Sequence, residues 1–162
     1  MPIEQYLEVA LLLLVCSAAM NDLMTRRIPN RLLLAGLAGA LVLHLLSANP
    51  GASLLAALGG MGTGLALFLP FYLVRGMAAG DVKMMAVVGA FTGPHEAIAI
   101  AVLTWCIGGV MALAVLLLRG RLQLALGNLG RLFSPERQSA GSIPYGVAIA
   151  AGTITVLVRH YG

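Results

Sequence analysis

Hydrophobic residues gather in six long stretches, and polar connections separate each stretch from the next. A helix needs about 20 mostly apolar residues to cross a bilayer, and several stretches meet or approach that length. Long apolar runs lack the alternation of a membrane β-strand, which favours helices over a barrel. The stretches cover residues 7–20, 32–46, 54–74, 82–91, 97–118 and 143–158. The pattern predicts an all-α, polytopic membrane helix bundle with about six transmembrane segments, forming a single domain over residues 1–162.

Glycine and proline mark where the predicted helices turn and where two of them pack. Turn sequences occur at residues 49–51 and 93–94, between hydrophobic stretches. Gly60 and Gly64 form a GxxxG pair in the third stretch, a spacing that lets helices approach closely in lipid. Pro70 lies in the same stretch and predicts a kink there.

Charged residues are scarce and unevenly placed. Hydrophobic residues make up 60% and charged residues 10% of the chain, against roughly 25% charged in soluble domains. Apart from Arg159, the basic residues lie in or directly beside the first, third and fifth connections. This alternation follows the positive-inside rule and accounts for the net charge of +4 without a nucleic-acid partner. We expect these connections to face the cytoplasm, with the N-terminus outside.

The longest connection, residues 120–142, has two possible structures. Leu122, Leu126, Leu129 and Phe133 fall on one helical face, which is typical of an amphipathic helix lying on the membrane surface. Glycines within the same segment favour a mobile loop instead. Both interpretations stay open.

Only six residues are acidic, and two of them occur at the cytoplasmic ends of hydrophobic stretches: Asp22 and Asp81. Ionisable groups at that depth are costly and usually functional. A structural explanation competes with this one. Asp22 lies four residues before Arg26, a favourable spacing for a helical ion pair, and Asp81 has Lys83 and Arg75 nearby.

Small residues before Asp81 favour the functional interpretation. Ala78, Ala79 and Gly80 leave room for a substrate backbone to approach the carboxylate. Two nearby carboxylates do not ionise together easily, so one is ionised and the other protonated. The ionised group can take a proton from water, while the protonated group polarises a peptide carbonyl and then donates to the leaving amine. This chemistry needs neither a metal nor a cofactor.

The other chemically versatile residues do not suggest a competing site. His44, His95 and His160 are predicted toward the outer face, away from both aspartates. Cys16 and Cys106 do not belong to a CxxC pair. We therefore expect no metal site.

Three motifs resemble those of one family. Residues 22–30 (DLMTRRIPN) are similar to the first catalytic motif of type IV prepilin peptidases, and residues 76–83 (GMAAGDVK) to their second, GxGD-centred motif. Residues 142–146 (SIPYG) resemble a third family signature. The chain departs from GxGD at Ala78, where the family pattern has glycine.

The resemblance implies a membrane aspartic endopeptidase with Asp22 and Asp81 as its catalytic pair. Its expected partners are the lipid bilayer and prepilin-like precursors, which carry a short basic leader before a hydrophobic helix. Cleavage would occur at the cytoplasmic face of the bacterial inner membrane. The small size resembles the branch that serves Flp-type (tight adherence) pili. Larger relatives carry paired CxxC motifs associated with N-methylation; this chain has none, so we expect no methyltransferase activity.

Six further residues are candidates for binding substrate or shaping the site: Gly80, Lys83, Arg26, Pro144, Tyr145 and Gly146. Lys83 is placed either to tune Asp81 electrostatically or to be a solvated anchor. Residues 144–146 are placed either to line the cleft or to start the last helix.

A small transporter or membrane scaffold is the alternative function. Two membrane-embedded aspartates beside a glycine-rich helix could line a cation path. Such a path needs polar groups near the midplane, however, and both aspartates are predicted at one edge.

Overall fold

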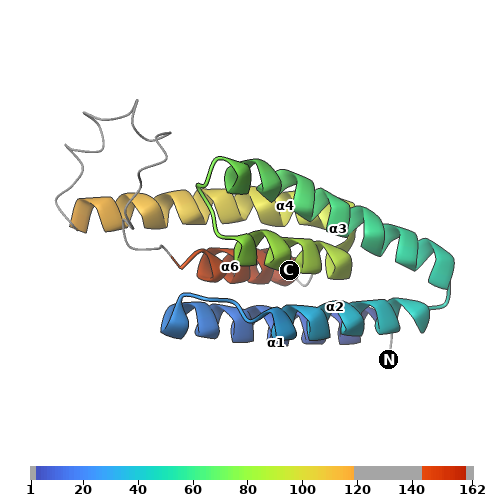
Figure 1. Ribbon diagram of the computed structural model, residues 1–162. Helices are drawn as coiled ribbons and strands as arrows, with labels where there is room; N and C mark the ends of the chain where they lie inside the picture. Colours follow the sequence, from blue (N-terminus) through green and yellow to red (C-terminus); the bar gives the residue numbers. More distant parts are fainter. Residues whose placement is uncertain (1–2, 119–143, 160–162) are drawn as a thin grey trace.

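The computed structural model describes residues 3–118 and 144–159, and their regular structure is entirely α-helical. The helices lie side by side in a bundle (Figure 1). Their bounds are α1 Ile3–Thr25, α2 Asn30–Leu45, α3 Pro50–Leu73, α4 Ala79–Leu118 and α6 Tyr145–Arg159. The prediction of an all-α bundle is confirmed. The two interpretations of residues 120–142 concern a segment outside the described residues.

The connection between α1 and α2 is a tight turn with a defined backbone geometry. Arg26 has a φ of 56°, and its N–H donates to the Asp22 carbonyl at 2.9 Å. A left-handed residue just past the last turn is a common way to end a helix. Pro29 is extended, with φ −64° and ψ 127°, and α2 starts at the next residue. The chain therefore turns back directly after the aspartate-bearing end of α1.

α4 consists of two arms that meet at Gly93. This residue has φ 79° and ψ 175°, which is not helical, and a glycine adopts such a φ at little cost. The chain folds back there, so the two arms run in opposite directions (Figure 1). The predicted turn at residues 93–94 is thus confirmed, and the arms correspond to the predicted fourth and fifth segments.

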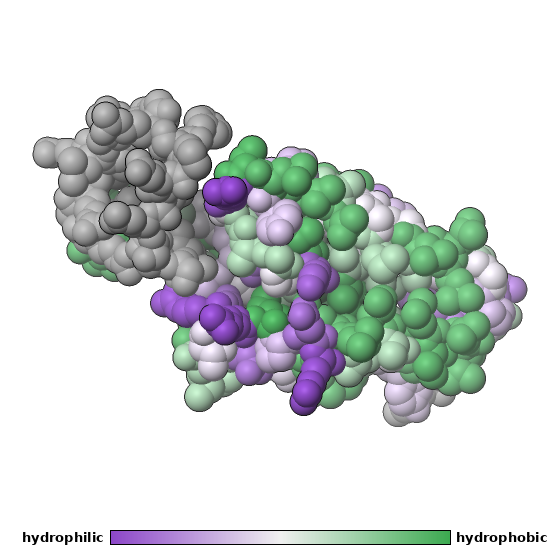
Figure 2. Space-filling view, viewed as in Figure 1, coloured by the Kyte–Doolittle hydropathy of each residue, from purple (hydrophilic) through white to green (hydrophobic). Residues whose placement is uncertain are grey.

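Three described helices are long and apolar enough to cross a membrane, namely α1, α3 and α4, while α2 and α6 are shorter apolar helices. Large hydrophobic side chains are exposed on several helices, including Leu13, Leu34 and Leu55. Figure 2 shows hydrophobic side chains over much of the bundle's flank. A flank of this kind suits a lipid environment. The number of six crossings stays a prediction.

Glycines set the contact between α3 and the first arm of α4. A Cβ added at Gly60 would overlap the carbonyl oxygen of Gly89, and one added at Gly64 would overlap that of Met85. The two backbones therefore touch along this line. This confirms the packing role predicted for the GxxxG pair.

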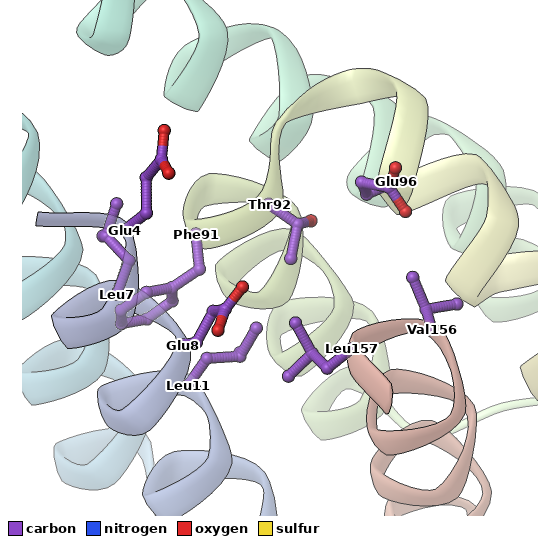
Figure 3. A pocket seen from close by; sticks show the side chains of 9 residues that line it. All are labelled: Glu4, Leu7, Glu8, Leu11, Phe91, Thr92, Glu96, Val156 and Leu157. Atoms are coloured by element: carbon purple, nitrogen blue, oxygen red, sulfur yellow. The ribbon is translucent and has the colours of Figure 1, made fainter. Parts of the chain in front are cut away.

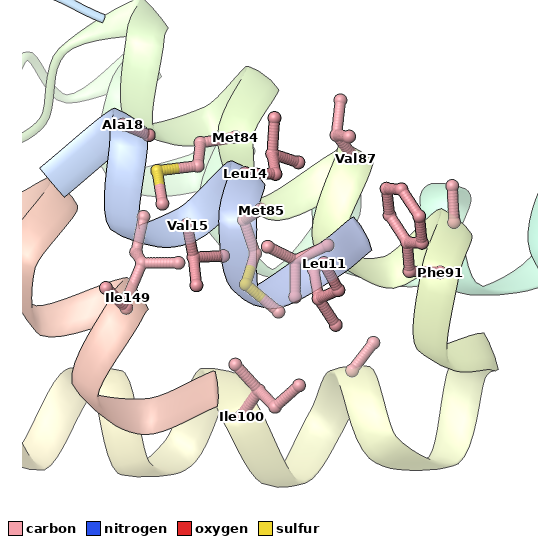
Figure 4. Packing of buried hydrophobic residues seen from close by; sticks show 14 of the residues in the cluster. Leu11, Leu14, Val15, Ala18, Met84, Met85, Val87, Phe91, Ile100 and Ile149 are labelled. Atoms are coloured by element: carbon pink, nitrogen blue, oxygen red, sulfur yellow. The ribbon is translucent and has the colours of Figure 1, made fainter. Parts of the chain in front are cut away.

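The first arm of α4 is the centre of the bundle. Met84 and Met85 are fully buried and meet Leu11 and Val15 of α1 and Ile149 of α6 (Figure 4). Such close-packed interiors tolerate little change in volume. The start of this arm, which carries Asp81, is consequently fixed against α1 and α6.

A buried histidine holds α2 against α4. The His44 ring nitrogen Nε2 donates to the Ala90 carbonyl at 2.9 Å, and the side chain is buried. Because a buried polar group without a partner is costly, this bond fixes the far end of α2.

The contact between Gly60 and Gly89 can be tested by substitution. We expect Gly60→Ala to destabilise the protein by about 1–3 kcal/mol, the usual cost of overpacking, because the methyl group meets rigid backbone. Gly62→Ala is the matched control, since a Cβ there meets nothing within 4 Å. Thermal unfolding in detergent measures both variants. Equal melting temperatures for the two would contradict the proposed backbone contact.

Candidate functional site

Asp22 and Asp81 lie at the same end of the bundle. Asp22 is in the last turn of α1, and Asp81 is in the first turn of α4. In Figure 1 these two helix ends and the start of α6 lie toward the same side. Each aspartate is only 6% exposed. Carboxylates at such sites need partners, because burying an unpaired charge is costly.

The partner of Asp22 comes from α6. The backbone N–H of Gly146 donates to Asp22 Oδ2 at 2.9 Å across 124 positions of sequence. N–H groups in the first turn of a helix have no partner within the helix, and they favour a negative charge. A Cβ at Gly146 would lie 2.9 Å from the same oxygen and 3.1 Å from the Asp22 Cβ. Glycine at this position therefore allows the carboxylate to approach the backbone.

Asp81 lies near the same turn of α6. Its carboxyl group lies within electrostatic range of the Asp22 carboxyl group and of the Tyr145 hydroxyl. The backbone N–H of Asp81 donates to the Ala78 carbonyl at 3.1 Å, in the first turn of α4. The structure thus brings both predicted aspartates together around residues 145–146.

Tyr145 packs against one aromatic residue of α3 and against a glycine of α4. Its ring lies edge-on to Phe68, with centroids 6.3 Å apart, and Phe68 stacks on Trp105 at 6.1 Å. A Cβ at Gly108 would lie 2.6 Å from the tyrosine ring, so the absence of a side chain there makes room for it. The interpretation of residues 144–146 as the start of the last helix is confirmed, whereas their lining of a cleft stays a prediction. Pro144 accepts the Val147 N–H at 3.1 Å and starts the helix, while Tyr145 and Gly146 lie beside the aspartates.

The basic residues near the aspartates have other partners or face outward. Lys83 Nζ donates to Asn30 Oδ1 at 3.1 Å. The Arg26 side chain is exposed, and the backbone of this residue forms the turn that follows α1. Within the described chain, neither aspartate forms an ion pair. The structural explanation, in which Asp22 pairs with Arg26 and Asp81 with Lys83 or Arg75, is therefore wrong. The reason is that the left-handed Arg26 ends α1 and that Asn30 holds the lysine.

Asn30 was not among the predicted site residues. Its place as the last residue of the first motif is the signal that would have included it. Gly80, which was predicted, lies near the α1–α2 turn: a Cβ there would be 3.5 Å from the Ile28 Cβ, an ordinary contact.

The other acidic residues of the described helices are at the opposite end. Glu4, Glu8 and Glu96 line a pocket of about 370 Å³ together with apolar side chains such as Phe91 (Figure 3). His95 Nδ1 lies 3.4 Å from Glu96 Oε1. Across residues 3–118 and 144–159 no group of three or more His, Cys, Asp or Glu side chains is arranged to hold a metal ion. The two aspartates are therefore separate from the remaining carboxylates.

Comparison with known proteins places this site in a family. The sequence profile of the type IV leader peptidase family matches residues 9–113, which include both aspartates. No curated protein and no solved structure shows a significant match. The matched residues make up more than half of the 162-residue chain, and the chain therefore belongs to the type IV leader peptidase family.

Proposed function

We propose that this protein is an aspartic endopeptidase that removes the short leader from prepilin-like precursors. The observation that carries the proposal is the pair of buried aspartates, contributed by two helices and gathered at one end of the bundle around the start of α6. Family membership supports a peptidase. The geometry adds the two groups that such a reaction needs.

The proposed reaction uses one water and no covalent intermediate. The ionised aspartate takes a proton from water, and the resulting hydroxide attacks the scissile carbonyl. The protonated aspartate hydrogen-bonds to the carbonyl oxygen and then gives a proton to the leaving amine. Asp22 is the better candidate for the ionised member, because charge-assisted hydrogen bonds from backbone N–H groups stabilise a carboxylate and Gly146 supplies one. Asp81 is then the acid.

The same end of the bundle carries basic residues, which supports a cytoplasmic site. Arg26 and Arg27 follow α1, Arg75 follows α3, and Lys83 is in the second turn of α4. By the positive-inside rule this end faces the cytoplasm. We propose that six segments cross the inner membrane with the N-terminus outside, that the two arms of α4 cross separately, and that the enzyme lacks methyltransferase activity.

The transporter alternative has less support. In the part of the chain that the structure describes, the acidic residues occur toward the two ends of the bundle, whereas transporters usually bind their ions near the bilayer midplane. No described contact favours that function over cleavage.

The catalytic pair is tested by conservative substitution. Asp22→Asn and Asp81→Asn should each abolish cleavage of a prepilin-like substrate, because asparagine keeps the size but cannot exchange the proton. The double variant should be scarcely slower than either single variant, since groups acting as a unit are strongly non-additive. Cleavage is followed by gel shift of the precursor in membranes or detergent.

Glu96→Gln is the matched control, because it removes a carboxylate at the opposite end of the bundle and should leave the rate nearly unchanged. Expression and membrane insertion of all variants should equal those of the wild type. Near-normal cleavage by Asp81→Asn would refute the aspartic mechanism.

The hydrogen bond from α6 to Asp22 gives an independent prediction. Gly146→Ala should displace the Asp22 carboxylate, since the new methyl group would crowd its oxygen, and misplacement by about 1 Å can cost roughly a hundredfold in rate. Gly39→Ala is the control, because a Cβ there meets nothing within 4 Å. Single-turnover cleavage rates compare the two. Wild-type rates for Gly146→Ala, with normal folding, would show that this contact does not position the carboxylate.

A further inference from the structure

A groove separate from the aspartate site runs between α2, α3 and α4. It encloses about 400 Å³. Its walls are apolar and include Leu34 and Leu37 of α2, Met61 of α3 and Val87 of α4. Leu34 is 69% exposed, so the groove opens on the flank of the bundle.

The mouth of this groove carries two cations. Arg31 and Lys83 line it together with Asn30. One Lys83 N–H is used by Asn30 Oδ1, and an ammonium group has two further donors. Neither cation forms an ion pair with a described residue. Among the described residues, the mouth therefore offers several free donors and two positive charges without an ion-pair partner.

The groove is short compared with the membrane. From Arg31 to Leu37 α2 rises by about 9 Å, at 1.5 Å per residue, which is roughly a third of the hydrocarbon thickness. It could hold the upper part of one acyl chain. Lipid tails are as apolar as leucine, so the walls cannot select one apolar occupant over another. Selection must come from the charged mouth.

We propose that this groove binds one anionic phospholipid, with its phosphate on Arg31 and Lys83 and one acyl chain along Leu34 and Leu37. Charge complementarity supports this occupant, since basic pockets between helices at the cytoplasmic side suit anionic headgroups. The leader of the proposed substrate is basic, so its charge would be repelled by the mouth. Lys83 follows Asp81 by two positions and points to a different side of α4, so the lipid lies beside the aspartate site without entering it.

α2 is held near both of its own ends, and the groove lies along its first half. Lys83 meets Asn30 at the mouth of the groove, and His44 meets Ala90 at the far end of α2, beyond the groove. The wall formed by α2 is therefore fixed, and the groove is available before a lipid arrives. A site of this kind links the enzyme to the charge of its membrane.

The test places a single tryptophan in the groove, which is possible because the chain has only one of its own, Trp105. In a Trp105→Phe background, Leu34→Trp places a fluorophore in the groove. The protein is reconstituted in phosphatidylcholine vesicles containing equal fractions of either brominated phosphatidylglycerol or brominated phosphatidylcholine. We expect stronger quenching by the brominated phosphatidylglycerol. Adding Arg31→Gln should weaken that preference about fivefold, the effect expected for one basic residue near an anionic surface.

Two controls fix the location. Met20→Trp, in the same background, reports an exposed position on α1 (60% exposed) near the same end, where we expect a weaker preference than at position 34. Arg27→Gln removes a cation outside the groove and should leave the preference at position 34 intact. Size-exclusion chromatography in detergent first shows that every variant is folded and not aggregated.

Several results would overturn the proposal. Equal quenching by both lipids at position 34 would mean that the groove accepts any lipid. Quenching relieved by a prepilin-like substrate, or dependent on the protein-to-lipid ratio, would assign the groove to the substrate helix or to a second copy. Because the readout is binding and not cleavage, none of these results bears on the catalytic role of the aspartates.

Discussion

The hydrogen bond from the Gly146 N–H to Asp22 is the interaction on which the site depends. It joins the end of α1 to the start of α6 and gives a buried carboxylate its partner. Removing that partner would leave a buried charge unpaired, which is strongly unfavourable. The bond also requires glycine, because any side chain would crowd the Asp22 oxygen. Gly146 therefore serves both the packing of α6 against α1 and the placement of the Asp22 carboxylate.

Backbone contact between α3 and α4 supplies the second half of the site. Gly60 lets the first arm of α4 lie directly against α3, and the buried methionines of that arm then fix it against α1 and α6. Asp81, in the first turn of the arm, is placed beside Asp22 by this packing and not by a direct bond between them. Rigid elements of this kind hold catalytic groups more precisely than loops do.

Sequence reasoning predicts the helices well, because their hydrophobic lengths and glycine positions are local features. The first stretch, residues 7–20, underestimates α1, which runs from Ile3 to Thr25, since charged and polar residues at a helix end do not interrupt the backbone bonds. Hydrogen bonds between distant positions are beyond such reasoning. The pairing of Lys83 with Asn30 spans 53 positions, and charge alone suggested Asp81 as its partner.

The convergence of the two aspartates is tested most directly by cross-linking. Cys16 and Cys106, which are exposed and free, are first replaced by alanine, and cysteines are then placed at Asp22 and Asp81. A short thiol-specific cross-linker should join this pair within one chain in native membranes. Cysteines at Glu4 and Asp81 form the control pair. Glu4 lies about five helical turns from Asp22 along α1, so this pair should not be joined. Cross-linking of the control pair with none between positions 22 and 81 would contradict a shared site.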